Sequence, residues 1–266
     1  MPARYLVGCL DEMSHMRMRS ELAGAELAPP KLKLAILGPL TLHLDGHAVA
    51  LGPLKQQQVL AMLLCRVNSV TSVDTLTDIL WGDEPPRTAR KNLQVYMACI
   101  RKLLRSDGND DRLTHRNGGY LLRASANELD LLEFQQRVSL ARDAGDLAGV
   151  VAGLGAALRL WRGGLLDGLT GTPLIGSEAD RLSVKYLGVF EDWAEGELTL
   201  GNATRVVEQI REVAGSHPFR ERLRQLEMTA LHRAGRQAEA LSVFDELRQA
   251  LAREMGLRPS PATEKL

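Results

Sequence analysis

The stretch from Thr88 to Arg105 reads TARKNLQVYMACIRKLLR and has a clear helical pattern. At about 100° per residue its apolar side chains gather on one side of a helix, as in an amphipathic helix. That side carries Ala89, Leu93, Met97, Ile100 and Leu104. The opposite side carries Arg90, Lys91, Gln94, Val95, Ala98, Arg101, Lys102 and Arg105. The pattern predicts a helix that packs with one face and exposes a cationic face.

The charge of this helix is one-sided, with five basic residues on the polar face and no acidic residue anywhere along it. A solvated helix normally mixes both signs, because opposite charges three or four positions apart stabilise it. Lys102 and Arg105 suit the negative end of the helix dipole. Arg90 and Lys91 do not, because they lie in the first turn, where the dipole disfavours cations. A bound polyanion offsets that cost, so the pattern favours nucleic acid over a plain solvated surface.

The first half of the helix has side chains that suit base recognition. The N-terminal part of a recognition helix meets base edges in the major groove. Arginine or lysine pairs well with guanine and glutamine with adenine, and an apolar side chain can touch a thymine methyl group. We therefore expect Arg90, Lys91 and Gln94 to read bases and Val95 to contact a thymine.

The second half of the helix and its first residue have other expected roles. Arg101, Lys102 and Arg105 are better placed for phosphate oxygens, which fix the register of a protein on DNA without reading its sequence. The Thr88 hydroxyl is expected to cap the helix by accepting one of the unpaired amide hydrogens at its start. Between Lys55 and Ser125 the chain holds eleven basic and seven acidic residues, so this region is locally basic in a protein of zero net charge.

A hairpin follows the helix. Two short strands are predicted at Leu113–Arg116 and Tyr120–Arg123, on either side of an Asn-Gly-Gly sequence that is typical of tight hairpin turns. Beside a recognition helix such a hairpin is a wing. Its expected contacts with an adjacent minor groove or the DNA backbone come from His115, Arg116 and Asn117.

Short elements precede the helix. Strands are predicted at Lys33–Leu37, Leu40–Leu44 and Val49–Leu51, with Asp45-Gly46 as a turn, and helices at Leu54–Val67 and Asp74–Trp81. The order of strands, three helices and hairpin predicts a winged helix-turn-helix with a small N-terminal β-sheet. We assign residues 31–125 to this DNA-binding domain and residues 1–30, which form no clear element, to a flexible arm.

The rest of the chain, residues 126–266, is predicted to be all helical. Asp130 and Glu133 have the spacing of a capping box for its first helix. Gly201 and Gly235 each follow one predicted helix and precede another, and their separation of 34 residues is the period of tetratricopeptide-like (TPR-like) helix hairpins. A glycine-rich insertion is expected at Trp161–Ser177. The fold class is therefore mainly α, with a winged helix-turn-helix followed by an all-α TPR-like domain.

Composition excludes several classes of protein. The chain is 45% hydrophobic and 25% charged, as in ordinary globular proteins. Its three cysteines are far apart, which suits buried thiols in a reducing cytoplasm. No apolar run reaches the length of a membrane-spanning helix, and the N-terminus lacks the pattern of a signal peptide. We expect a cytoplasmic, nucleoid-associated protein with no membrane contact.

The ordered motifs resemble one family, the Streptomyces antibiotic regulatory proteins, over about residues 32–266. The motifs that carry the resemblance are Leu37-Gly38-Pro39-Leu40, Gly52-Pro53-Leu54-Lys55-Gln56, Leu80-Trp81-Gly82-Asp83, Leu93-Gln94-Val95-Tyr96, Gly118-Gly119-Tyr120, Leu160-Trp161-Arg162-Gly163, His217-Pro218-Phe219-Arg220-Glu221 and Gly235-Arg236-Gln237-Ala238-Glu239-Ala240-Leu241.

This resemblance implies an OmpR-like winged-helix domain followed by a bacterial transcriptional activation domain. It implies an activator of a secondary-metabolite (antibiotic) gene cluster that binds direct repeats in double-stranded promoter DNA, as copies lying side by side. It also implies recruitment of RNA polymerase holoenzyme through its sigma and alpha subunits. By analogy, Asn68–Ser72 and Gly82–Arg87 are the segments expected to touch the polymerase.

Two other classes of function were weighed. Catalysis is disfavoured, because the chain has no nucleophile elbow, no zinc-ligand spacing and no phosphate-binding loop. We therefore expect no catalytic residues, no cofactor and no metal, and a short family member that does not hydrolyse nucleotide. The alternative is a helical-repeat interaction scaffold, or an effector-binding regulator, that does not itself read DNA. The basic helix and the wing are the features that separate the two.

Overall fold

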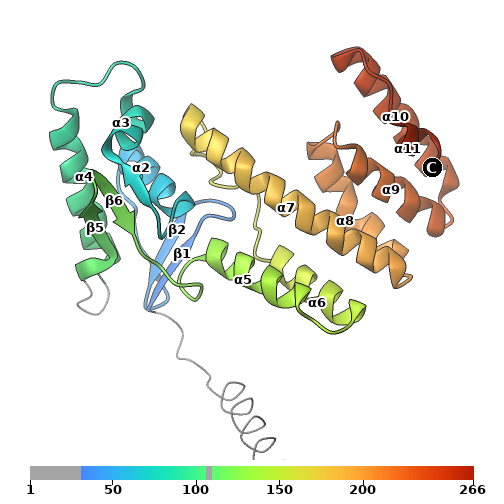
Figure 1. Ribbon diagram of the computed structural model, residues 1–266, viewed down its shortest axis with the longest axis horizontal. Coiled ribbons are helices and arrows are strands. Elements are labelled where there is room, and N and C mark those ends of the chain that lie inside the picture. Colours follow the sequence, from blue (N-terminus) through green and yellow to red (C-terminus); the bar gives the residue numbers. More distant parts are fainter. Residues whose placement is uncertain (1–30, 106–109) are drawn as a thin grey trace, which may run out of the picture.

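The computed structural model describes residues 31–105 and 110–266. Two small sheets and the helices α2, α3 and α4 lie at one end, and the helices α5 to α11 extend from them toward the other end (Figure 1). This arrangement confirms the predicted fold class. The arm predicted at residues 1–30 lies outside the described residues.

The first sheet has the antiparallel order β1-β2-β3, with β1 at Leu32–Ala35, β2 at Thr41–Leu44 and β3 at His47–Ala48. Asp45 and Gly46 form the predicted turn, with φ angles of 48° and 81°. The third strand was predicted at Val49–Leu51, which is wrong. A two-residue turn returns the chain at once, so pairing begins at His47 opposite Leu44.

Three helices pack on one another beside this sheet: α2 at Leu54–Cys65, α3 at Val73–Trp81 and α4 at Ala89–Leu104. Their buried side chains, which include Leu60, Leu76 and Met97, belong to one hydrophobic core. Ser72 caps α3, because its hydroxyl accepts a hydrogen bond from the backbone N–H of Thr75 at 3.0 Å. Burial of one face of each helix thus fixes the position of α4 at the edge of the molecule.

The second sheet has the antiparallel order β4-β6-β5. Its β5–β6 hairpin follows the short 3-10 helix η1 at Asp110–Arg112. The predicted hairpin strands are β5 (Leu113–Arg116) and β6 (Gly119–Leu122). The third strand, β4 (Val70–Ser72), falls in the segment predicted to be a turn. A Cβ atom on Gly119 would lie 2.3 Å from the Thr71 carbonyl oxygen, so glycine is required where β6 passes β4.

Helices of the second part pack mainly against their neighbours in sequence. They are α5 (Asp130–Arg142), α6 (Leu147–Leu158), α7 (Pro173–Thr199), α8 (Ala203–Ser216), α9 (Glu221–Arg233), α10 (Gln237–Met255) and α11 (Pro261–Glu264). The two repeat glycines stand just past the ends of α7 and α9 with positive φ, 87° at Gly201 and 78° at Gly235. The 34-residue spacing therefore marks successive helix hairpins, as predicted.

The two parts of the molecule are joined at the end of β1. The carboxylate of Asp130 accepts hydrogen bonds from the backbone N–H groups of Ile36 and Leu37 at 2.9 and 3.0 Å, and from Arg162 at 3.2 Å. The backbone N–H of Arg162 donates to the Leu37 carbonyl at 2.7 Å. We call these four residues the Asp130 clamp. The glycine-rich insertion predicted at Trp161–Ser177 supplies Arg162 and so docks the helical part on the sheet.

The Asp130 clamp corrects one prediction and has an electrostatic consequence. Leu129, not Asp130, is the N-cap of α5, and it makes no side-chain capping bond. The expected capping box is therefore absent, because the Asp130 carboxylate is used by β1. Burial raises the pKa of Asp130, and it outweighs the hydrogen bonds and the charge of Arg162, which lower it.

A second contact joins α7 to α2. Arg66, which follows α2, forms an ion pair with Glu178 of α7 at 2.7 Å, and Arg181 holds the other oxygen of the same carboxylate at 2.8 Å. The start of α7 also packs against α3. Within the part of the chain that the structure describes, no helix combines the length and apolar character needed to cross a bilayer.

Candidate DNA interface

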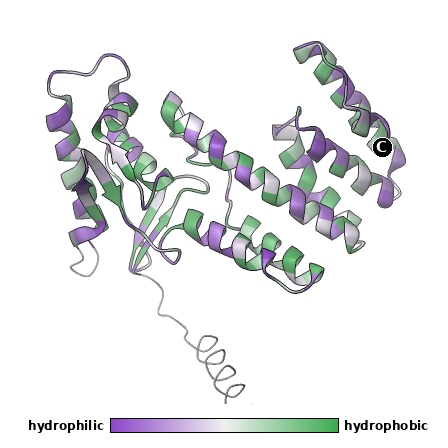
Figure 2. Ribbon diagram, in the orientation of Figure 1, coloured by the Kyte–Doolittle hydropathy of each residue, from purple (hydrophilic) through white to green (hydrophobic). Residues whose placement is uncertain are grey.

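The helix α4 is amphipathic in the way its sequence predicts. Its five apolar-face residues are the five that the structure buries, Ala89, Leu93, Met97, Ile100 and Leu104. Figure 2 shows hydrophilic residues recurring along α4 at the outer edge of the molecule. The helix therefore presents its other face to solvent.

The exposed face of α4 carries cations that pair with nothing in the described chain. Arg90, Lys91 and Lys102 are exposed, and the structure gives them no hydrogen bond or ion pair with any described residue. Gln94 is also exposed, and Val95 is 54% exposed despite its apolar side chain. These side chains are free to meet a ligand without breaking an existing contact.

Arginines of the helical part differ from the exposed cations of α4 in having acidic neighbours. Most of them are paired with a carboxylate, as in Arg137–Glu133, Arg142–Asp192, Arg205–Glu197, Arg211–Glu239, Arg220–Glu191, Arg222–Glu195, Arg224–Glu227 and Arg248–Asp245. Surface pairs of this kind contribute little stability, but they cancel the local field. Arg90, Lys91 and Lys102 of α4, in contrast, have no carboxylate partner among the described residues.

Thr88 departs from its expected role. It is the N-cap residue of α4, but its side chain makes no capping hydrogen bond. The hydroxyl oxygen instead lies 3.3 Å from the side-chain amide nitrogen of Asn92, one turn into the helix. The first backbone N–H groups of α4 therefore have no side-chain cap from Thr88, and such groups suit an anion such as phosphate.

Arg101 lies between the helix and the wing. Its Nε atom donates to the Leu113 carbonyl at 2.9 Å, and its guanidinium carbon lies 5.9 Å from the ring centre of Tyr120. The side chain is half-buried, whereas the neighbouring Lys102 is exposed. The guanidinium thus already has a structural role, which the helical wheel did not reveal because both partners lie in the hairpin.

The wing presents its predicted tip residues. His115, Arg116 and Asn117 are exposed, and Asn117 and Gly118 adopt positive φ angles of 49° and 73° in the turn. The His115 ring meets the Tyr120 ring edge-on at a centroid distance of 5.1 Å. The Gly118 carbonyl accepts from the backbone N–H of Val73, which ties the tip to the start of α3.

Sequence reasoning missed one cation of this surface. Arg87 is exposed in the loop before α4 and makes no hydrogen bond or ion pair with the described residues. By analogy with the family, it was assigned to the polymerase-facing loop Gly82–Arg87. The signal that could have found it is its position one residue before the N-cap of a helix already rich in cations.

Comparison with known proteins places both parts of the chain. Residues 46–122 match the family described as "Transcriptional regulatory protein, C terminal", and residues 129–266 match the "Bacterial transcriptional activator domain". The regulatory protein AfsR of Streptomyces coelicolor is 37% identical over 239 residues, which is 88% of this chain and 24% of AfsR. The chain therefore spans about a quarter of that relative.

Other relatives are matched over more of their length. The regulatory protein DnrI of Streptomyces peucetius is 34% identical over 88% of this chain and 90% of DnrI. The solved structure of Mycobacterium tuberculosis EmbR, in complex with a low affinity phosphopeptide, superposes with a TM-score of 0.79 at 33% identity, covering 88% of this chain and 63% of EmbR. The chain belongs to the family of Streptomyces antibiotic regulatory proteins, transcription regulators in which an OmpR-like winged-helix domain precedes a bacterial transcriptional activator domain.

Proposed function

We propose that the chain is a sequence-specific DNA-binding transcriptional activator of a secondary-metabolite gene cluster. The observation that carries this proposal is the set of three exposed cations on α4 without a partner among the described residues, Arg90, Lys91 and Lys102, set against a helical domain whose arginines are mostly paired. Condensed counterions are released when such cations meet phosphates, which supplies much of the affinity for DNA. The family membership supports transcription regulation by itself.

The proposed docking places the first turns of α4 in the major groove. Arg90, Lys91 and Gln94 are the base-reading residues, with Val95 against a thymine methyl group. The phosphate contacts are Lys102, Arg105 and the added Arg87, together with whatever part of the Arg101 guanidinium the wing leaves available. The wing contacts the adjacent groove or backbone through His115, Arg116 and Asn117.

Activation is proposed to follow from side-by-side binding to direct repeats and from contact with RNA polymerase holoenzyme through its sigma and alpha subunits. Of the two segments assigned to that contact, the loop Gly82–Arg87 suits it better, because all of its residues are exposed. The segment Asn68–Ser72 contains the strand β4, and Thr71 at its centre is fully buried. Run-off transcription with purified holoenzyme measures this step separately from DNA binding.

The decisive experiment measures affinity for a duplex that the chain itself selects from a random library. We expect the double variant Arg90→Ala/Lys91→Ala to lose at least roughly tenfold in affinity and to relax base preference at the contacted positions. The matched control is Arg253→Ala/Arg258→Ala, which removes two exposed and unpaired arginines from the helical domain.

Two outcomes contradict the proposal. One is a failure to enrich any duplex, and the other is equal affinity of the Arg90/Lys91 variant and the control. A steep fall in affinity with rising salt is expected for the native chain. A chain that binds the duplex tightly but leaves transcript levels unchanged would contradict activation and leave DNA reading intact.

A further inference from the structure

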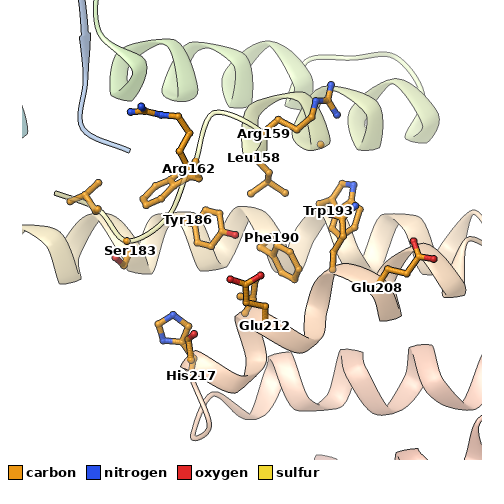
Figure 3. A pocket seen from close by; sticks show the side chains of 18 of the residues that line it. Leu158, Arg159, Arg162, Ser183, Tyr186, Phe190, Trp193, Glu208, Glu212 and His217 are labelled. Carbon is orange, nitrogen blue, oxygen red and sulfur yellow. The ribbon is translucent and has the colours of Figure 1, made fainter. Parts of the chain in front are cut away.

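The helical domain contains a cavity of about 760 Å³ between α6, α7, α8 and the glycine-rich insertion. Its lining includes a row of four aromatic side chains, Trp161, Tyr186, Phe190 and Trp193. Figure 3 shows the last three along α7. Successive ring centres in this row are 4.5, 6.2 and 5.4 Å apart. A cavity of this size with an aromatic lining has the dimensions of a small-molecule site.

The aromatic row contains two polar groups without partners. The indole nitrogens Nε1 of Trp161 and Trp193 are buried and make no hydrogen bond, although Trp193 as a whole is only 1% exposed. Buried indole N–H groups normally find an acceptor, because leaving one unpaired is costly. Gly155 lies against Trp193, and a Cβ atom there would stand 3.2 Å from Nε1. The backbone of Gly155 therefore packs against this N–H group, which is closed off from solvent.

Some charged side chains of the cavity lining have partners, and others do not. Arg162 is held by Asp130 and Arg205 by Glu197. Glu208 and Glu212, four residues apart on α8, have no hydrogen bond or ion pair with any described residue. In Figure 3 the Glu212 carboxylate points toward Tyr186 and Phe190.

The aromatic and unpaired acidic side chains of the lining favour a positively charged occupant over a negatively charged one. Burial, aided by the Glu212 charge, raises the pKa of Tyr186, so this wall of the cavity holds negative charge and stays protonated at the phenol. Aromatic faces and unpaired carboxylates both attract cations. The lining guanidinium without a partner, Arg159, extends along α6 away from Tyr186 and Phe190 (Figure 3).

We propose that this cavity binds a small aromatic amine, whose ring stacks on the row of aromatic side chains and whose ammonium group lies at Glu212. Arg162 is both a lining residue and a member of the Asp130 clamp. An occupant therefore touches the segment that docks the helical domain on β1, which makes the cavity an effector site for the regulator.

The test uses 2-phenylethylamine as the probe and 3-phenylpropionate as its counterpart of opposite charge. The chain has three tryptophans, so a Trp81→Phe background leaves only the two cavity indoles to report binding by fluorescence. We expect saturable quenching by the amine and much weaker quenching by the acid. Glu212→Gln should weaken the amine roughly tenfold, and the control Glu246→Gln, an exposed carboxylate on α10, should not.

Binding is measured without DNA, so its result does not depend on the proposed DNA reading. Arg90→Ala/Lys91→Ala should bind the amine as the parent does. Coupling to the clamp is read from hydrogen exchange of the Ile36 and Leu37 amides, which should change at saturating amine. Absence of saturable quenching, preference for the acid, or an unaffected Glu212→Gln variant overturns the site. Unchanged exchange at Ile36 and Leu37 overturns its role as an effector site.

Discussion

The buried carboxylate of Glu178 shows how single residues link the two domains. Burial alone would raise the pKa of this group, but hydrogen bonds from Arg181 and Arg66 outweigh burial and hold the pKa below its usual value of 4.5. The same negative charge, with burial, raises the pKa of the neighbouring Cys65 thiol to about 12, so this cysteine stays protonated and unreactive. The charge of Glu178 is thus satisfied by two guanidinium groups and not by solvent.

Replacing Glu178 by glutamine should destabilise the chain at neutral pH. A carboxyl group with a lowered folded-state pKa stabilises the fold above its unfolded pKa, and this contribution is lost as pH falls through the folded-state pKa. We expect Glu178→Gln to lose about 1–3 kcal/mol of unfolding free energy near pH 7. The difference from the parent should shrink below about pH 4.5.

Urea unfolding across this pH range measures the effect. Asp180→Asn is the matched control, because Asp180 is exposed on the same helix and has no hydrogen bond or ion pair with the described residues. A constant difference between Glu178→Gln and the parent at all pH values would show that the ion pair with Arg66 and Arg181 is not its source.

At the scale of elements, α4 and the wing form one unit through Arg101. Its Nε atom binds the wing backbone at Leu113, and its guanidinium stacks on Tyr120, whose other neighbour is His115. Lys102, the next residue, faces solvent. Two adjacent cations on one helix thus have different roles: Arg101 links α4 to the wing, and Lys102 is exposed to solvent, where the proposed function places a DNA phosphate.

Substitution at these adjacent positions should separate structure from binding. Lys102→Ala should leave the unfolding free energy unchanged and reduce the slope of log affinity against log salt by about one, as for a single lost phosphate contact. Arg101→Ala should lower the unfolding free energy by about 1–3 kcal/mol, because a charged hydrogen bond is lost at a half-buried site. Equal stability of the two variants would contradict the structural role of Arg101.

Local periodicity explains which elements the sequence could predict. The buried face of α4 can be predicted from the spacing of Leu93, Met97 and Ile100, because helical periodicity is a property of that segment alone. The strand β4 was missed because three residues, Val70–Ser72, hold no detectable period and pair with β6 far along the chain. Contacts of that range leave no pattern in either segment alone.

The same limit applies to the site. The exposed cations of α4 were found because they lie on one helix, whereas the binding of Arg101 to the wing and of Asp130 to β1 joins segments far apart in sequence. The cavity was missed for the same reason, since its aromatic row combines the insertion at Trp161 with α7. The sequence feature that could have indicated the cavity is the spacing of Tyr186, Phe190 and Trp193, which recur at intervals of four and three residues.

At the level of the whole molecule, one hydrophobic core runs through both domains, and a few polar groups add specific contacts between them. The Asp130 clamp and the Arg66–Glu178 pair lie at separate points, β1 and the end of α2. The proposed function, in which the chain contacts DNA and RNA polymerase at once, requires a fixed relation between the domains.

Removing the Asp130 carboxylate should loosen this relation. Asp130→Ala leaves the buried N–H groups of Ile36 and Leu37 without their acceptor, at a cost of roughly 1–3 kcal/mol for each group that water does not reach. Burial disfavours the ionised form of Asp130, which is why its pKa is raised, and the alanine variant no longer carries this cost. The net loss of unfolding free energy should therefore be smaller than the sum for the two N–H groups. Hydrogen exchange at Ile36 and Leu37 should accelerate, while exchange in α4 stays slow.

Exchange measured by mass spectrometry, with Asp143→Ala as control, decides the matter. Asp143 stands at the other end of α5, is exposed and makes no side-chain hydrogen bond or ion pair with the described chain. If the clamp holds the domains together, the Asp130 variant alone should show faster exchange at β1 and a lower unfolding free energy. Its affinity for a single DNA half-site should be retained, because α4 packs on α2 and α3 and not on α5. Slow exchange in both variants would mean that the other contacts between the domains, the shared core and the Arg66–Glu178 pair among them, suffice to hold the orientation.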